Sequence, residues 1–155
     1  MSAAPLWFLG TLVRPKLTGA DTGGRFALWE AVLPRDAAPP VHTHPQDETL
    51  YVLEGSVAAW KGDPAETAAQ QCGPGAALFV PGGMPHTFRV DSDTARVLFL
   101  STPAGIEDFV HALAEPAEWP WLQPPPDGPR VPRERIDAVE REHGVVRMGP
   151  PPTRT

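Results

Sequence analysis

Residues 41–55 read V-H-T-H-P-Q-D-E-T-L-Y-V-L-E-G, and the interpretation of the whole chain starts from them. His42 and His44 are two positions apart, so in an extended strand their side chains point to the same face. Glu48 has the same parity and can reach that face if the strand resumes after a short turn at residues 45–47. Two imidazoles and a carboxylate on one side suit a divalent first-row metal ion.

A second stretch, residues 75–86, reads G-A-A-L-F-V-P-G-G-M-P-H and offers a fourth ligand, His86. Together the two stretches resemble the paired motifs of the cupins, G-x5-H-x-H-x3-4-E-x6-G and G-x5-P-x-G-x2-H-x3-N. Asp36, six positions before His42, stands where the first motif has its leading glycine, and Val90 where the second has its asparagine; neither position is a metal ligand in the family. The resemblance implies one metal ion inside a small β-barrel, held by His42, His44, Glu48 and His86.

Within the cupins, the block around Glu48 and the proline-rich tail look like small bacterial proteins of the quercetin dioxygenase-like type. The fold that this resemblance implies is all-β, a single jelly-roll (double-stranded β-helix) barrel. Short runs of apolar residues separated by turn residues point the same way. We expect strands at residues 6–13, 25–33, 49–53, 57–61, 66–71, 77–80, 86–90 and 95–101.

The 155 residues favour one domain, with the barrel at about residues 6–102 and an extension at 103–155. In the extension, apolar spacing predicts a helix over 106–113, and a proline start with a glycine stop predicts another over 132–143. Residues 18–24 are expected to form a loop, and residues 149–155 to be frayed. Trp119 and Trp121, in a proline-rich segment, either close the barrel mouth or pack on its outer sheet.

The net charge of -6 argues against nucleic acid or an anionic membrane as partner. No apolar run is long enough to cross a bilayer, and the first twelve residues lack the order of a signal peptide, so the cytoplasm is the expected location. The single cysteine, Cys72, excludes a disulfide within the chain. The apolar segment 6–13 is a natural cover for the sheet edge of a neighbouring copy, which predicts a homodimer.

The apolar residues nearest the ligands are the candidates for substrate binding. Leu50 and Val52 share the parity of Glu48, and Phe88 shares that of His86, so we expect all three to line a cavity beside the metal; ordinary barrel core is the alternative. Tyr51 and Leu53 face the opposite way and are expected to make packing or dimer contacts.

The function that the resemblance implies is a metal-dependent dioxygenase acting on a small aromatic or enol substrate, such as a flavonol. Four protein ligands on an octahedral ion leave two positions for substrate oxygen and dioxygen. Glu48 is the candidate catalytic base for the substrate hydroxyl. The ligand set does not distinguish among Fe, Mn, Ni, Co, Cu and Zn. The alternative is a metal-binding cupin without oxygenase activity, either a small-molecule binding or sensing protein or an isomerase or decarboxylase.

Overall fold

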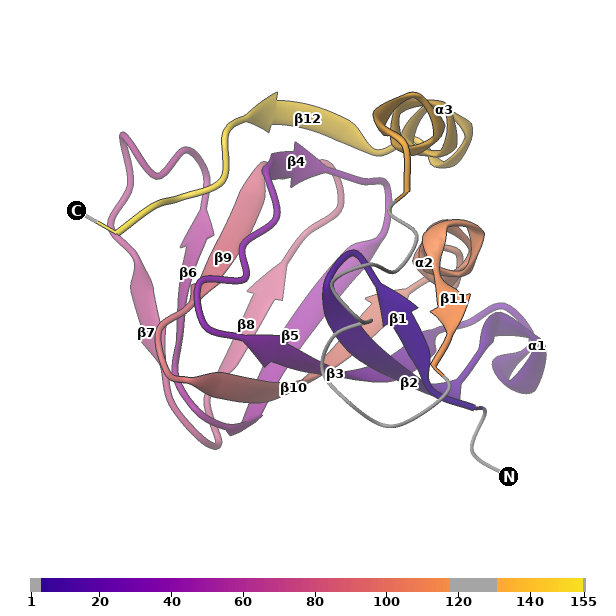
Figure 1. Ribbon diagram of the computed structural model, residues 1–155, viewed down its shortest axis with the longest axis horizontal. Helices are drawn as coiled ribbons and strands as arrows, with labels where there is room; N and C mark the ends of the chain where they lie inside the picture. The colour runs from indigo at the N-terminus through magenta and orange to yellow at the C-terminus, as the bar shows by residue number, and fades with distance from the viewer. Residues whose placement is uncertain (1–3, 118–130, 155) are drawn as a thin grey trace.

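Two antiparallel sheets packed face to face form the body of the protein in the computed structural model, which describes residues 4–117 and 131–154 (Figure 1). The larger sheet has the order β11-β1-β2-β3-β10-β5-β8. Its strands are β1 (Leu6–Phe8), β2 (Thr11–Leu17), β3 (Ala27–Pro34), β5 (Asp47–Glu54), β8 (Ala77–Val80), β10 (Thr94–Thr102) and β11 (Glu115–Pro116). The all-β jelly-roll prediction is confirmed.

The smaller sheet has the order β12-β4-β9-β6-β7. Its strands are β4 (Val41–Thr43), β6 (Val57–Lys61), β7 (Gln70–Cys72), β9 (His86–Val90) and β12 (Val146–Gly149). The described residues also form three helices: α1 (Gly19–Thr22), α2 (Ile106–Leu113) and α3 (Arg133–His143). In Figure 1, α2 and α3 lie together at one end of the two sheets. None of these helices has the length and apolar composition needed to cross a membrane.

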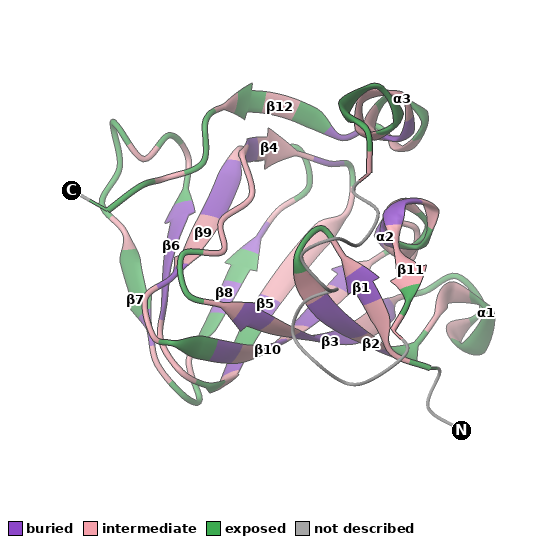
Figure 2. Ribbon diagram, viewed as in Figure 1, coloured by how far each residue is buried: buried purple, intermediate pink, exposed green. Residues whose placement is uncertain are grey.

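The core lies between the two sheets, where alternate residues of each strand point inward (Figure 2). On β3 the buried positions include Ala27, Trp29, Ala31 and Leu33, two residues apart in each step. Val52 on β5 and Val97 on β10 are cross-strand partners and both are fully buried. This alternation leaves the outward positions of the larger sheet available for other contacts.

The N-terminal segment differs from the single strand expected over residues 6–13. Leu9 and Gly10 have positive φ angles of 46° and 84°, and they form a two-residue turn between β1 and β2. Glycine adopts this backbone region readily, so a tight hairpin replaces a straight strand. The other edge of β1 pairs with β11, so this segment is covered within its own chain and does not offer the free edge that the dimer prediction assumed.

The C-terminal extension contains both expected helices, and α3 ends at Gly144, whose φ of 69° is left-handed. Two further expectations were wrong. Residues 19–22 form the short helix α1, because the Asp21 carboxylate accepts hydrogen bonds from the backbone N–H and the hydroxyl of Thr18 at the start of the helix. Residues 150–154 are not frayed: the Arg154 guanidinium donates to the Asp36 carboxylate, which anchors the tail against the barrel. Trp119 and Trp121 lie outside the described residues.

Gly55, the last residue of the first motif, lies in the two-residue connection where the chain crosses from β5 in the larger sheet to β6 in the smaller one, in a position that only glycine suits. Its φ is +84°, and a Cβ atom there would lie 2.5 Å from the Thr94 carbonyl oxygen and 2.9 Å from the Ala95 Cα. Both neighbours are backbone atoms at the start of β10, so neither moves without disturbing the sheet.

Replacing Gly55 with alanine should therefore destabilise the fold by about 3 kcal/mol, the sum of backbone strain and steric overlap. The midpoint of urea denaturation measures this. Gly75→Ala is the matched control, because Gly75 also has a positive φ (+87°) but has no heavy atom within 4 Å of the added Cβ. Equal losses for the two variants would show that the contact with β10 is unimportant.

Candidate metal centre

Three histidines from two adjacent strands meet at one end of the space between the sheets. His42 on β4 is the cross-strand partner of His86 on β9, and their ring centroids are 4.4 Å apart. His44 follows β4 directly and its ring lies 4.9 Å from that of His86. One ring nitrogen from each residue lies within 4.8 Å of the others, so the three side chains could hold a metal ion.

Two loops that deliver these histidines are fixed to each other. The Gly83 N–H donates to the His44 carbonyl at 2.9 Å, and the Gly82 N–H donates to the Asp47 carboxylate at 2.7 Å. A Cβ atom at Gly82 would collide with the Pro45 carbonyl oxygen, so the close approach of the two loops requires glycine there. The relative positions of His44 and His86 are therefore set by the backbone.

Each imidazole is oriented by a backbone carbonyl two residues away in the sequence. The Nδ1–O distances are 2.7 Å for His42 with Pro40, 3.1 Å for His44 with Gln46, and 2.9 Å for His86 with Met84. A carbonyl oxygen only accepts, so Nδ1 carries the proton in each neutral ring and Nε2 presents a lone pair. Such second partners orient metal-binding histidines in proteins.

Glu48, at the start of β5, faces two of these lone pairs. Its carboxylate oxygens lie 3.3 Å from His44 Nε2 and 3.8 Å from His86 Nε2. Both nitrogens are buried and neither has a hydrogen-bond partner. Lone pairs and a carboxylate facing each other lack a proton or cation between them, and burial makes that arrangement costly. A divalent cation satisfies all of these groups, so the residues present fit a metal ion.

The electrostatics favour the protonation states that bind metal. Burial lowers the pKa of His42 to about 4, helped by the neighbouring His86, and burial likewise lowers the pKa of His86. Burial alone would raise the pKa of the Glu48 carboxyl, but positive charge on the imidazoles, with a hydrogen bond from His44 foremost, lowers the pKa more, so the net shift is downward. At neutral pH, His42 and His86 are neutral, and a bound divalent ion would provide the positive charge that keeps Glu48 ionised.

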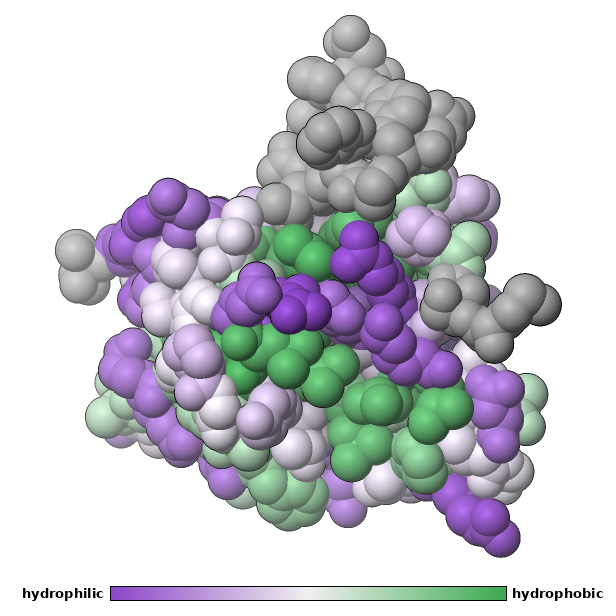
Figure 3. Space-filling model, turned by 90° about the horizontal axis from the view of Figure 1, so that it is seen from below, coloured by the Kyte–Doolittle hydropathy of each residue, from purple (hydrophilic) through white to green (hydrophobic). Residues whose placement is uncertain are grey.

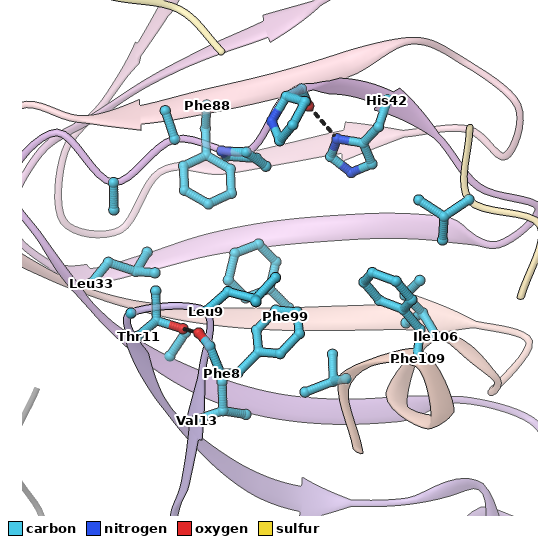
Figure 4. A pocket seen from close by; sticks show the side chains of 18 of the residues that line it. Phe8, Leu9, Thr11, Val13, Leu33, His42, Phe88, Phe99, Ile106 and Phe109 are labelled. Atoms are coloured by element: carbon cyan, nitrogen blue, oxygen red, sulfur yellow. Dashed lines mark hydrogen bonds between the residues drawn. The ribbon is translucent and has the colours of Figure 1, made fainter. Parts of the chain in front are cut away.

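A cavity of about 600 Å³ opens beside the histidines, and Figure 4 shows its two sides. Phe88 lines it, as do all four predicted ligands. Leu50 and Val52 do not: both belong to the buried core, farther along β5 than Glu48. The expectation that these two residues line the cavity is thus corrected to the core alternative, while substrate binding by Phe88 stays a prediction.

Most of the cavity wall comes from residues that the sequence did not single out. Trp29 and Phe99 stack with ring centroids 5.6 Å apart, and Phe88 lies 5.8 Å from Phe99. On the side of the β1–β2 hairpin, Phe8 makes an edge contact with Phe109 of α2 at 6.0 Å. The alternation that buries Trp29 is visible in the sequence, but the contacts of the hairpin and of α2 are not.

Residues 28–103 match the family described as Cupin domain. This chain belongs to the cupin superfamily. Quercetin 2,3-dioxygenase of Bacillus subtilis (strain 168) is 29% identical over 99 residues, which cover 63% of this chain and 28% of that protein. The chain thus spans little more than a quarter of the length of this relative.

Solved structures agree with the fold. The polyketide cyclase RemF of Streptomyces resistomycificus is 25% identical, and the match covers 84% of this chain and 79% of that one with a TM-score of 0.52. KdgF from Halomonas sp. is 18% identical, covering 64% of this chain and 85% of that one with a TM-score of 0.55. The match to RemF reaches well beyond the segment that the Cupin domain family covers.

His42→Ala should abolish tight binding of a divalent metal, because it removes one of three converging nitrogens. Metal content after purification without chelators, and titration of the stripped protein with Co(II) or Zn(II), measure this. His111→Ala is the control, since His111 lies exposed on α2. Full metal content in the His42 variant would exclude the histidine site.

Proposed function

We propose that this protein is a metal-dependent oxygenase that acts on a small aromatic or enol substrate, with a flavonol as the first candidate. One observation carries the proposal: four side chains that offer hydrogen-bond acceptors lie together on the wall of a cavity that aromatic side chains line. These four are His42, His44, Glu48 and His86. Similarity to a quercetin 2,3-dioxygenase supports it.

The cavity suits an aromatic ligand in size and in chemistry. A volume of about 600 Å³ lies within the range of sites that hold drug-sized molecules. Phe88, Phe99 and Trp29 offer ring faces and edges for stacking. A sugar would need several free hydrogen-bonding side chains in this wall. Outside the candidate metal site, the charged residues that line the cavity are already paired: Arg147 with Glu140, Arg35 with Asp93, and Asp36 with Arg154.

A bound divalent ion would supply a Lewis acid that binds the substrate oxygen and dioxygen. The protein residues have separate roles. His42, His44 and His86 hold the ion, each fixed through its Nδ1–H. Glu48 is ionised and accepts the proton of the substrate hydroxyl at a carboxylate oxygen, which leaves the substrate as an anion. The aromatic wall orients the ring and excludes water from it.

A non-oxidative reaction on a similar substrate is the second candidate. The match to the polyketide cyclase RemF covers more of this chain than the match to quercetin dioxygenase does, and it reaches beyond the cupin segment. A cyclase would use the same aromatic cavity and the same base without consuming dioxygen. Oxygen dependence separates the two candidates, and binding without conversion would indicate a binding or sensing protein.

Glu48→Gln should retain much of the metal and lose turnover by about 10²- to 10⁴-fold, the usual contribution of a general base. The assay is oxygen uptake with quercetin and metal content on the same preparation. The loss should ease at high pH, where more of the flavonol is already ionised in solution. Glu66→Gln, in an exposed loop, is the matched control.

Full metal with unchanged turnover would remove Glu48 from the chemistry. A wild-type protein that takes up no oxygen with flavonols but converts an aromatic polyketide anaerobically would favour the cyclase. Loss of metal together with loss of turnover in Glu48→Gln would make Glu48 a ligand first.

We also propose that the protein is a homodimer, formed through the outer face of the larger sheet. Tyr51 on β5 and Phe79 on β8 point outward from this sheet, with 41% and 50% of their surfaces exposed. Figure 3 views the molecule from this side and shows hydrophobic surface on both sides of a hydrophilic band. Apolar surface of this kind on a sheet face is typical of association sites.

Sedimentation equilibrium should give twice the 16.7 kDa mass of the chain at micromolar concentration, and Phe79→Asp should return it to the monomer mass. Met148→Asp is the control, because Met148 is 59% exposed but lies on β12 of the smaller sheet. A wild-type monomer would contradict the dimer proposal.

A further inference from the structure

The turn of the β1–β2 hairpin holds an unusual residue beside the cavity. Leu9 has a φ of 46°, in the left-handed region that L-residues other than glycine, asparagine and aspartate rarely adopt. The other residue of the turn, Gly10, has a φ of 84°. Phe8 and Thr11, which flank the turn, are cross-strand partners. Positive φ at both turn positions is the pattern for which Asn-Gly is the preferred sequence. Leucine is therefore a poor choice for the turn itself.

Packing does not account for the leucine either. Leu9 is 47% exposed, so its side chain gains only part of the free energy of burial. The hairpin is held without it, by the ladder between β1 and β2 and by the Thr11 hydroxyl, which donates to the Phe8 carbonyl at 2.6 Å. Neither the backbone nor the core explains why a large apolar side chain stands in this turn.

The position of Leu9 suggests the reason. Leu9 lines the cavity together with Phe8, and Figure 4 shows the hairpin on the side of the cavity opposite His42 and Phe88. Among the described residues, Leu9 and Asp36 are the non-glycine residues with positive φ, and both line this cavity. Backbone strain gathers at functional sites, where the surrounding structure maintains it for the sake of a side chain's position.

We propose that Leu9 is a specificity-determining residue, which packs on the end of the bound aromatic substrate that is remote from the histidines. The inference rests on the proposed function, because that function places the reacting end of the substrate at His42, His44 and His86. It adds a size class: the ligand is a molecule longer than two fused rings, long enough to reach from the histidines to the hairpin. The exposed part of Leu9 is the surface that such a ligand would cover.

Leu9→Asn tests this, because it installs the preferred turn sequence while removing the apolar side chain. Flavone is the probe, since it has the ring framework of a flavonol but no hydroxyl group to bind a metal, and isothermal titration calorimetry gives its Kd with metal-loaded and metal-stripped protein. We expect the Kd of flavone to rise roughly five-fold, the effect of losing a half-buried leucine contact. The Kd of naphthalene, a shorter ligand, should change less than two-fold.

The urea midpoint of Leu9→Asn should equal or exceed that of the wild type, which a residue needed only for folding would not allow. Leu9→Met keeps an apolar side chain and should retain flavone binding. Met148→Asn removes another exposed apolar side chain, 59% exposed against 47% for Leu9, away from the cavity and should leave both measurements unchanged.

An unchanged Kd for flavone in Leu9→Asn would overturn the proposal, as would equal losses for flavone and naphthalene. A lowered urea midpoint would assign Leu9 to the hairpin instead, and a wild-type protein that fails to bind flavone would exclude the multi-ring ligand. Flavone binding that depends on Leu9, with no oxygen uptake on quercetin, would leave this proposal standing and overturn only the oxygenase.

Discussion

A buried cluster that contains acceptors but no donor is the constraint to which the rest of the structure conforms. The Nδ1–H groups of His42, His44 and His86 each donate a hydrogen bond to a backbone carbonyl, so each Nε2 presents a lone pair. The Nε2 atoms of His44 and His86 face the carboxylate of Glu48. Solvent does not reach these two nitrogens. Such a cluster is stable when a cation fills it, and the fold supplies the rigidity that keeps it open for one.

That rigidity comes from backbone contacts that the ligand residues do not make themselves. The β4–β9 pairing sets His42 against His86, and the two loops joined through Gly82 and Gly83 set His44 against His86. Metal ligation depends on donor positions to within a few tenths of an ångström, so the glycines and carbonyls around the site matter as much as the ligands. Gly83 of the second motif, and Gly82 beside it, thus have a physical role in fixing the two loops.

Sequence reasoning brought the four candidate ligands together but predicted the cavity wall poorly, for one physical reason. Strand alternation determines which face a side chain occupies, so His42, His44 and Glu48 could be placed together from their spacing. Alternation does not determine how far along that face the cavity extends. Leu50 and Val52 share the inward face with Glu48, but they are packed in the buried core and do not line the cavity.

Long-range contacts account for the other differences. Residues 6–13 are predicted as one strand because Leu9, in the turn, is apolar like the residues around it. Gly10 alone indicates that the chain turns there. The tail is predicted to be frayed because it is a chain terminus, whereas Arg154 contacts Asp36, 118 positions away in the sequence. No local pattern contains information on a contact of that kind.

The origin of the cavity wall limits what any relative can teach about the substrate. The ligands lie within residues 28–103, the part of the chain that matches the Cupin domain family. Phe8, Leu9 and Val13 precede that segment, while Ile106, Phe109 and Val110 follow it, and all six line the cavity. Part of the cavity wall therefore lies outside the segment that contains the four candidate ligands, although Trp29, Phe88 and Phe99 lie within it. A relative matched only through residues 28–103 gives no information on the part of the wall formed by the β1–β2 hairpin and α2.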